Sequence, residues 1–312
     1  MRWIAPILFL LLSSSIWGDN HIFLFHRFDD PRHPSTSVST KQLRKDFQYL
    51  KEHGYRVVSL DYLIHHMNED KLVAFTIDDG YESFYLHGFK LFREFGYPFT
   101  IFIYTEAIDS EYSDFMDWVE LRYLAKFGEI AIHSYNHSHL THLEPIEVMR
   151  DTQKAIEIFK KNMGYPPKYY SYPYGEFDKD VRDIIEAFGF DAIFNQSIGA
   201  VNSESDIYNL NRIPLLGKYD IRKKLKIRFL PVEWFQPHHY PKDGKLKRVI
   251  AKVPENLKRV QLYISGYGWR VVPVDNGIVD IEFQKPIKLK YRLTRLFIRT
   301  FDNRWNGNLI VK

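Results

Sequence analysis

The sequence predicts an α/β fold, a parallel sheet or (β/α) barrel, followed by a small all-β sandwich. Two observations lead to this prediction. Between residues 19 and 220, short apolar runs alternate with helical segments about seven times, which is typical of parallel sheets and favours a barrel. Beyond Tyr219 the runs are short, partly alternating in polarity and separated by Pro, Gly and Asp-Asn-Gly turns, which indicates antiparallel strands.

The charge distribution supports the same division into domains, 19–220 and 221–312. Residues 1–220 contain 22 Lys and Arg against 32 Asp and Glu, whereas residues 221–312 contain 21 against 7, a balance of +14. A basic domain is expected to meet an anionic partner, such as phospholipid headgroups of a membrane or an acidic cell-wall polymer. No nucleic-acid-binding motif accompanies the charge, so nucleic acid is not expected as a partner. The chain has no cysteine, so any metal must be held by His and carboxylate groups.

Residues 1–18 have the features of a secretory signal peptide. Arg2 precedes the apolar stretch 4–12, and three serines and Gly18 follow it. The apolar core is about half of the ~20 residues that a bilayer-spanning helix needs. We therefore expect export to the periplasm or the extracellular space, with either cleavage near Gly18 or retention as an uncleaved membrane tether.

The predicted elements follow from local signals in chain order. The apolar run 21–25 predicts a buried strand that ends at His26, and Ser39 or Thr40 is the expected N-cap of a helix that stops at Gly54. Further barrel strands are expected over 57–60, 72–79, 99–104, 130–132, 169–172, 190–194 and 210–214, with helices from 61 and over about 82–95, 118–127, 144–162 and 179–188. The sandwich strands are expected over 245–253, 259–265, 269–274, 278–283 and 288–299.

The run from Leu72 to Gly80 reads Leu-Val-Ala-Phe-Thr-Ile-Asp-Asp-Gly. An uninterrupted apolar run suits a strand covered on both faces. Asp78 and Asp79 then lie at the carboxyl end of the strand, where such folds place their chemistry. The alternative is that Asp-Asp-Gly is only a turn. Partners for two adjacent carboxylates elsewhere in the chain decide between these interpretations.

Two more motifs follow predicted strands and supply such partners. The first, His133-Ser-Tyr-Asn-His137, places two imidazoles at the same end of the sheet. Two histidines and one carboxylate are a common ligand set of catalytic zinc, and the second aspartate is then free to act as a base. In the second motif, Ser171-Tyr-Pro-Tyr-Gly175, Pro and Gly fix a turn whose backbone N–H groups could face an oxyanion.

In this order, the three motifs resemble those of the polysaccharide deacetylase family, carbohydrate esterase family 4, which read Thr-Phe-Asp-Asp-Gly, His-Ser/Thr-x-x-His and Arg-x-Pro-Tyr/Phe-Gly. The resemblance runs from about residue 21 to 216. It implies a distorted (β/α) barrel that removes acetyl groups from N-acetylated sugars with a divalent metal, Zn²⁺ or alternatively Co²⁺ or Ni²⁺. The implied roles are metal ligands for Asp79, His133 and His137, general base for Asp78, and oxyanion binding for the backbone N–H of Tyr174.

The chain departs from the family pattern at two places. Position 171 is Ser where many members have an Arg that pairs with the base, and no Leu-x-His occurs near the end of the barrel to supply the catalytic acid. The chain is similar to exported poly-N-acetylglucosamine deacetylases in opening with a strand that ends in His. We therefore expect His26 to be the acid, with His142 as the alternative, and Arg212 to replace the missing Arg beside Asp78.

The predicted function is metal-dependent removal of N-acetyl groups from an N-acetylglucosamine-containing polysaccharide. A non-haem Fe(II) oxygenase also uses two His and one carboxylate, but on a different, all-β fold. A non-catalytic polysaccharide-binding protein on the same barrel is the other alternative. The polymer itself stays open among poly-β-1,6-N-acetylglucosamine, peptidoglycan, chitin-like chains and capsular sugars.

Overall fold

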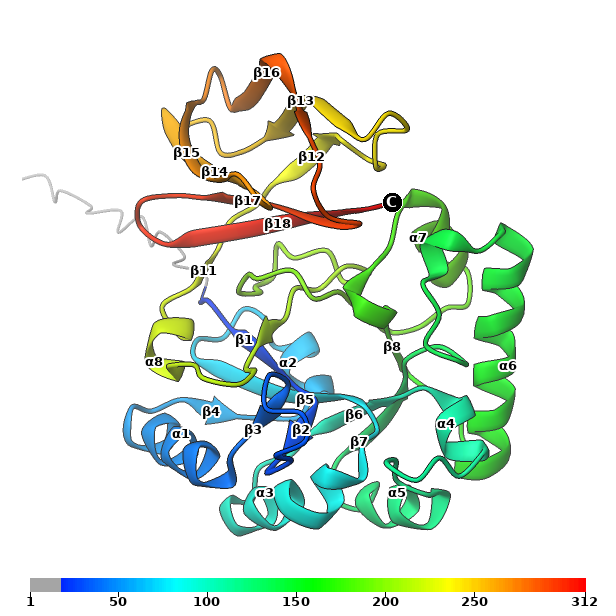
Figure 1. Ribbon diagram of the computed structural model, residues 1–312. Coiled ribbons are helices and arrows are strands. Elements are labelled where there is room, and N and C mark those ends of the chain that lie inside the picture. Colours follow the sequence, from blue (N-terminus) through cyan, green and yellow to red (C-terminus); the bar gives the residue numbers. More distant parts are fainter. Residues whose placement is uncertain (1–17) are drawn as a thin grey trace, which may run out of the picture.

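A computed structural model describes residues 18–312 (Figure 1). The predicted signal peptide, residues 1–18, lies outside the described residues apart from Gly18. Among residues 18–312, no helix combines the length and the apolar character needed to cross a membrane.

The barrel is built on an eight-stranded parallel sheet. Its order is β10-β1-β5-β6-β7-β8-β9, and the short β4 pairs with β5. The strands are β1 His21–Phe25, β4 Arg56–Val57, β5 Leu72–Asp79, β6 Thr100–Ile103, β7 Glu129–Ile132, β8 Tyr169–Ser171, β9 Ala192–Phe194 and β10 Ile213–Pro214.

The segment that precedes β10 links the two ends of this sheet. The N–H of Leu210 donates to the Ile193 carbonyl at 2.9 Å, and the N–H of Asn195 donates to the Leu210 carbonyl at 3.0 Å. β10 in turn pairs with β1. The distorted (β/α) barrel that the sequence predicts is therefore confirmed, with its irregular part between β9 and β1.

Helices surround the sheet in Figure 1, and several end where the sequence predicts. The Ser39 hydroxyl accepts a hydrogen bond from the N–H of Gln42 and caps the first helix, while Gly164 ends the longest one in a left-handed conformation. The helices are α1 Thr40–Glu52, α2 Leu60–His65, α3 Phe89–Phe95, α4 Thr105–Asp109, α5 Trp118–Leu124, α6 Pro145–Met163, α7 Lys179–Glu186 and α8 Ile221–Lys224, with a π-helical turn η1 Phe84–Gly88, 3₁₀ turns η2 Leu140–His142 and η3 Pro173–Gly175, and a small pair of strands β2 Arg27–Phe28 and β3 Ser37–Val38.

Several predicted barrel strands are shorter in the structure: those expected over 190–194 and 210–214, for example, begin only at Ala192 and Ile213. The strand expected over 57–60 stops at Val57 because the Ser59 hydroxyl caps α2, accepting from the N–H of Tyr62. The helix expected over 82–95 is confirmed, and its residues Phe84–Gly88 form the π-helical turn η1 before α3. All eight residues of β5 are buried, as the uninterrupted apolar run predicts.

Beyond the barrel, residues 228–312 form a second group of strands, which we call the C-terminal β unit. It contains a five-stranded sheet of order β11-β18-β17-β14-β15 and a three-stranded sheet of order β12-β13-β16. The two sheets enclose a hydrophobic core separate from that of the barrel. The strands are β11 Arg228–Phe229, β12 Glu233–Gln236, β13 Lys245–Lys252, β14 Arg259–Ile264, β15 Gly268–Pro273, β16 Ile278–Lys288, β17 Leu293–Arg299 and β18 Arg304–Val311. The domain boundary near residue 220 stays a prediction, with which the separate cores agree.

Sequence reasoning missed β11, β12 and β18 and misplaced one strand boundary. β16 continues to Lys288, so the strand expected over 288–299 begins only at Leu293. β18 contains a glycine and two asparagines at 306–308, which have low strand propensity, but it pairs with β17 from Trp305 to Val311. It also packs on the barrel, because a Cβ at Gly307 would lie 3.2 Å from the Cβ of Ser197. Figure 1 shows β17 and β18 on the side of the β unit that faces the barrel.

Candidate active site

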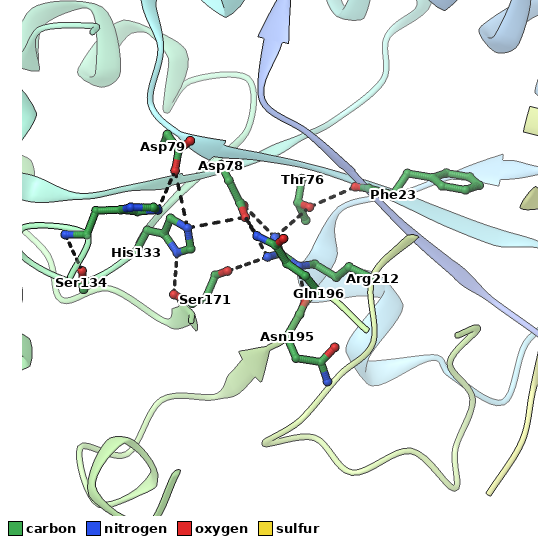
Figure 2. A network of polar contacts seen from close by, with 11 residues as sticks. Phe23, Thr76, Asp78, Asp79, His133, Ser134, Ser171, Asn195, Gln196 and Arg212 are labelled. Carbon is green, nitrogen blue, oxygen red and sulfur yellow. Dashed lines mark hydrogen bonds and ion pairs between the residues drawn. The ribbon is translucent and has the colours of Figure 1, made fainter. Parts of the chain in front are cut away.

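The carboxyl ends of β5 and β7 bring the predicted metal ligands together (Figure 2). In Asp79, His133 and His137, one ligand atom from each side chain lies within 4.8 Å of the other two. The Asp79 Oδ1 atom is 3.1 Å from His137 Nε2 and 3.6 Å from His133 Nε2. Asp79 therefore shares one site with two histidines that lie at least 54 positions further along the chain. This argues against the interpretation of Asp-Asp-Gly as only a turn.

The backbone of this site is held in uncommon conformations. Asp79, Ser134 and His137 have φ values of 74°, 72° and 56°, in the left-handed region that non-glycine residues seldom occupy. Two contacts support the loop between the histidines: the Ser134 hydroxyl accepts from the N–H of His137, and the carboxylate of Asp151 on α6 accepts from the N–H of Tyr135, both at 3.0 Å. Strained backbone of this kind persists where the surrounding structure fixes it, and it collects at functional sites.

His133 is fully buried and is oriented as a ligand. Its Nδ1 atom lies 2.6 Å from the carbonyl oxygen of Ser171, so the Nδ1–H donates there and the Nε2 lone pair faces the aspartates. Burial lowers the pKa of His133 to about 4, against the partly opposing charge of Asp78. The imidazole is therefore neutral at pH 7, which is the form that binds metal.

The same three residues fit a divalent cation. Burial by itself would raise the pKa of Asp79, but the 3.1 Å contact with His137 and the electrostatic influence of the nearby histidines outweigh it and hold the pKa below its usual value. Among the described residues, the buried Asp79 Oδ1 and His133 Nε2 atoms have no hydrogen-bond partner of acceptable geometry. Buried polar atoms without partners are rare and call for an explanation. Two imidazole nitrogens and one carboxylate oxygen are the donors that zinc prefers, and they leave one coordination position open.

A second group of potential ligands, Asp30, His33 and Asp114, is less suitable for a metal. Arg27 pairs with Asp30 at 2.8 Å and with Asp114 at 2.6 Å, and Arg32 also pairs with both carboxylates. The arginines already neutralise these oxygens.

Asp78 is clamped by Arg212. The Nη1 and Nη2 atoms of Arg212 lie 2.7 and 2.8 Å from the two carboxylate oxygens of Asp78, and both side chains have no exposed surface. The remaining donors of Arg212 reach the Asn195 carbonyl at 2.9 Å, the Thr76 hydroxyl at 3.2 Å and the Ser171 hydroxyl at 2.6 Å. The five N–H groups of the guanidinium therefore all have acceptors. Ser171 occupies the place where the family resemblance expects an Arg, and here it accepts a hydrogen bond from the Arg212 side chain.

The Arg212 clamp determines the charge of Asp78. Burial alone would raise the pKa of Asp78, but the positive charge of Arg212, its hydrogen bonds and the nearby histidines outweigh burial and keep the pKa below its usual value. Asp78 is therefore ionised at neutral pH. Gln196, which follows β9, also approaches it, with its Nε2 atom 3.4 Å from Asp78 Oδ2.

His26 and Tyr174 flank the aspartates. His26 directly follows β1, and its Nδ1 atom is buried without a partner in the described structure. Its electrostatic influence lowers the pKa of both Asp78 and Asp79. Tyr174 lies in η3 with φ of 59°, and its ring centroid is 4.3 Å from that of His137. His142, the alternative acid, contacts the backbone carbonyl of Lys312 through Nε2. His26 thus lies close to both aspartates, and its role as the acid stays a prediction.

Sequence reasoning missed several residues that support the site. Asp151 is a buried carboxylate on the apolar face of α6, next to Val148 and Ala155 in helical spacing, and this placement was a usable signal. Glu176 directly follows the third motif and is fully buried. Nothing in the local sequence distinguishes Gln196.

Comparison with known proteins agrees with this geometry. Residues 65–193 match the family described as polysaccharide deacetylase. The poly-beta-1,6-N-acetyl-D-glucosamine N-deacetylase of Escherichia coli (strain K12) is 26% identical over an alignment that covers 80% of this chain and 46% of that protein. The enzyme of the same name from Staphylococcus aureus (strain MSSA476) is 24% identical over 212 residues, 62% of this chain and 72% of that protein. The chain thus spans about half the length of its Escherichia coli relative.

Solved structures share the barrel. The Streptococcus pyogenes deacetylase PplD in complex with acetate superposes with a TM-score of 0.60 at 17% identity, over 64% of this chain and 93% of that one. IcaB from Ammonifex degensii superposes with a TM-score of 0.56 at 21% identity, over 64% and 92%. The family match over residues 65–193 and the three motifs support a polysaccharide deacetylase domain in this part of the chain, and the solved structures share its fold.

Proposed function

We propose that the protein is a divalent-metal-dependent N-deacetylase of poly-β-1,6-N-acetyl-D-glucosamine. The observation that carries this proposal is the convergence of Asp79, His133 and His137 beside an aspartate held ionised by Arg212. The names of the relatives from Escherichia coli and Staphylococcus aureus support the choice of substrate.

Asp78 is the general base in this proposal. Its lowered pKa keeps it ionised at neutral pH, so it can accept a proton from the attacking water. Each carboxylate oxygen has more than one acceptor site, so the bidentate contact with Arg212 leaves room for that water. Arg212 fixes the direction in which the carboxylate faces.

Asp79, His133 and His137 would hold the cation, of which Zn²⁺ is the first candidate and Co²⁺ or Ni²⁺ are alternatives. When bound, such a cation polarises a carbonyl oxygen and makes a water molecule more acidic. The carbonyl of Ser171 keeps His133 in the tautomer that presents Nε2 to the cation.

Tyr174 and His26 complete the proposed reaction. The backbone N–H of Tyr174 would donate to the oxygen that becomes negative when water adds to the acetyl carbonyl. An amine leaves only after its nitrogen takes up a proton, and His26 would give that proton.

We also propose that the protein is exported and that its basic C-terminal region docks to an anionic surface. The signal-like residues 1–18 and the +14 balance of residues 221–312 support these two points. Attraction between exposed charges is screened beyond ~8 Å at physiological salt, so binding of the full chain to anionic vesicles should fall steeply as salt rises.

The test of the main proposal is incubation of the full chain with β-1,6-linked N-acetylglucosamine oligosaccharides, with loss of acetyl followed by mass spectrometry. Release that stops on addition of a chelator and returns with Zn²⁺ is the expected result. Chitin oligosaccharides in parallel test the linkage. Binding without release would favour a non-catalytic sugar-binding protein, and oxygen consumption with Fe(II) would favour an oxygenase. Release that is insensitive to the chelator would refute metal dependence.

A further inference from the structure

A buried carboxylate connects the third motif to the C-terminal β unit. Glu176 directly follows η3 and has no exposed surface. Its Oε1 atom lies 2.8 Å from Arg292 Nη2, and its Oε2 atom lies 3.2 Å from Arg292 Nη1 and 2.8 Å from His139 Nδ1. Arg292 belongs to the turn between β16 and β17. The β unit thus contributes a bidentate ion pair to a loop of the barrel.

The loop that Glu176 follows is strained and depends on its surroundings. Tyr174 and Gly175 have φ values of 59° and 69°. A Cβ at position 175 would lie 2.7 Å from the backbone nitrogen of Gln196, so only glycine fits there. A bidentate Arg–carboxylate contact fixes both direction and plane, which a single hydrogen bond does not. The pair is therefore well suited to hold this loop in place.

From Glu176 the contacts continue to the candidate metal site. The ring of His139 stacks on that of Tyr174, with centroids 4.1 Å apart and planes 23° apart. The Tyr174 ring in turn meets the edge of His137 at 4.3 Å. Arg292 is thus joined to a candidate metal ligand through three intervening side chains, each in direct contact with the next.

We propose that the C-terminal β unit acts on the reaction through Arg292, which with Glu176 positions the loop carrying the Tyr174 N–H group. Arg292 and Glu176 are positioning residues: neither reaches the reacting atoms. The inference rests on the proposed deacetylase function for its kinetic consequence, but the contact between the β unit and the loop can be tested without turnover.

The kinetic test uses Arg292→Ala in the full chain. A displacement of about 1 Å in a catalytic group can reduce the rate by ~10²-fold, so kcat on the oligosaccharide should fall by about this factor while KM and bound metal stay near wild type. Because Arg292 is 39% exposed, guanidinium ions in the buffer can reach the vacated position, and millimolar guanidinium chloride should restore part of kcat. Arg292→Lys keeps the positive charge but cannot make the two-nitrogen contact with Glu176. Its kcat should therefore stay below that of the wild type.

The matched control is Arg248→Ala. Arg248 also contacts a carboxylate, Asp280, through two nitrogens, but within the three-stranded sheet of the β unit. This variant should keep wild-type kcat. Because Arg292→Ala leaves Glu176 buried without its partner and can impair folding, the double variant with Glu176→Gln is also measured, and its kcat should fall no further than that of the worse single variant.

The rate of amide hydrogen exchange in a peptide covering residues 172–178 measures directly how firmly the loop is held. Exchange should become faster in Arg292→Ala and stay unchanged in Arg248→Ala. Unchanged exchange would overturn the inference whether or not the protein is a deacetylase. Faster exchange with wild-type kcat would also overturn it, because the loop would then be held without effect on the reaction. If the wild type itself releases no acetyl, the proposed function fails, and the exchange result alone decides whether Arg292 positions the loop.

Discussion

Replacement of Arg212 by methionine should distinguish how much the ion pair with Asp78 stabilises the fold from how much the packing of the Arg212 side chain does. Arg212→Met keeps an unbranched side chain of similar length but removes the five hydrogen bonds of the guanidinium and leaves the Asp78 carboxylate, which has no exposed surface, without its partner. Removing one member of a buried ion pair typically costs about 3–5 kcal/mol. The free energy of unfolding of a domain is typically about 5–15 kcal/mol, so the variant should still fold. Its unfolding midpoint should lie at a clearly lower urea concentration than that of the wild type.

The pH dependence of this loss follows from the pKa of Asp78. In the wild type the pKa is lowered, so the pair stabilises the fold above the ordinary carboxylate pKa and this contribution is lost as pH falls through the folded value. In Arg212→Met the lowering effect of Arg212 is lost, and burial, the largest influence on Asp78, raises its pKa. The variant therefore gains stability relative to neutral pH when Asp78 takes up a proton. The difference in unfolding free energy between wild type and variant should be largest near pH 7 and shrink towards pH 4.

Urea unfolding followed by circular dichroism, with chelator present so that metal affinity does not contribute, measures both quantities. The control is the double variant Arg212→Met with Asp78→Asn, in which the neutral amide removes the unpaired charge. It should be more stable than Arg212→Met at pH 7, because replacing both members of a buried pair costs less than removing one. A loss below about 1 kcal/mol in the single variant, the size expected of an exposed pair, or a double variant less stable than the single one, would refute the clamp.

Four further substitutions test the remaining assignments. His133→Ala should bind no metal and show no turnover, and normal metal content by elemental analysis would remove His133 from the ligand set. Asp78→Asn should keep its metal and lose nearly all activity, so loss of both would mean that Asp78 is itself a ligand. His26→Ala should slow amide substrates by ~10²–10⁴-fold and aryl acetates far less, because a phenolate leaves without protonation; equal losses would assign His26 a structural role. Burial raises the pKa of Asp151 from 3.8 to about 6, so its stabilising effect is complete below pH 4 and is lost as pH rises through 6. Asp151→Asn should flatten the stability profile between pH 4 and 7 by up to about 3 kcal/mol, and an unchanged profile would contradict the raised pKa.

Features that depend on neighbouring residues could be predicted from the sequence. The apolar run that ends at Asp78 and Asp79 predicted a strand buried on both faces, and β5 is buried at every position. Ser39 or Thr40 was the predicted N-cap of α1, and the structure has Ser39 there; Gly164 was the predicted end of α6 and is its C-cap. These signals are local because a cap involves only one turn of backbone. The placement of all three motifs after strands was enough to predict that they meet, since the carboxyl ends of parallel strands share one edge.

Contacts between distant segments were decided by the tertiary structure. Arg212 reaches Asp78 across 134 positions, and the sequence could suggest this pairing but not its bidentate geometry or the part played by Ser171. The pairing of Glu176 with Arg292, 116 positions away, left no local signal at all. β18 has weak strand propensity and forms because β17 lies beside it and the barrel lies beneath it. Hydrophobic periodicity and helix capping depend on residues a few positions apart. The contacts named above form only when loops close and elements pack against each other, and a local sequence pattern does not predict which distant residues then meet.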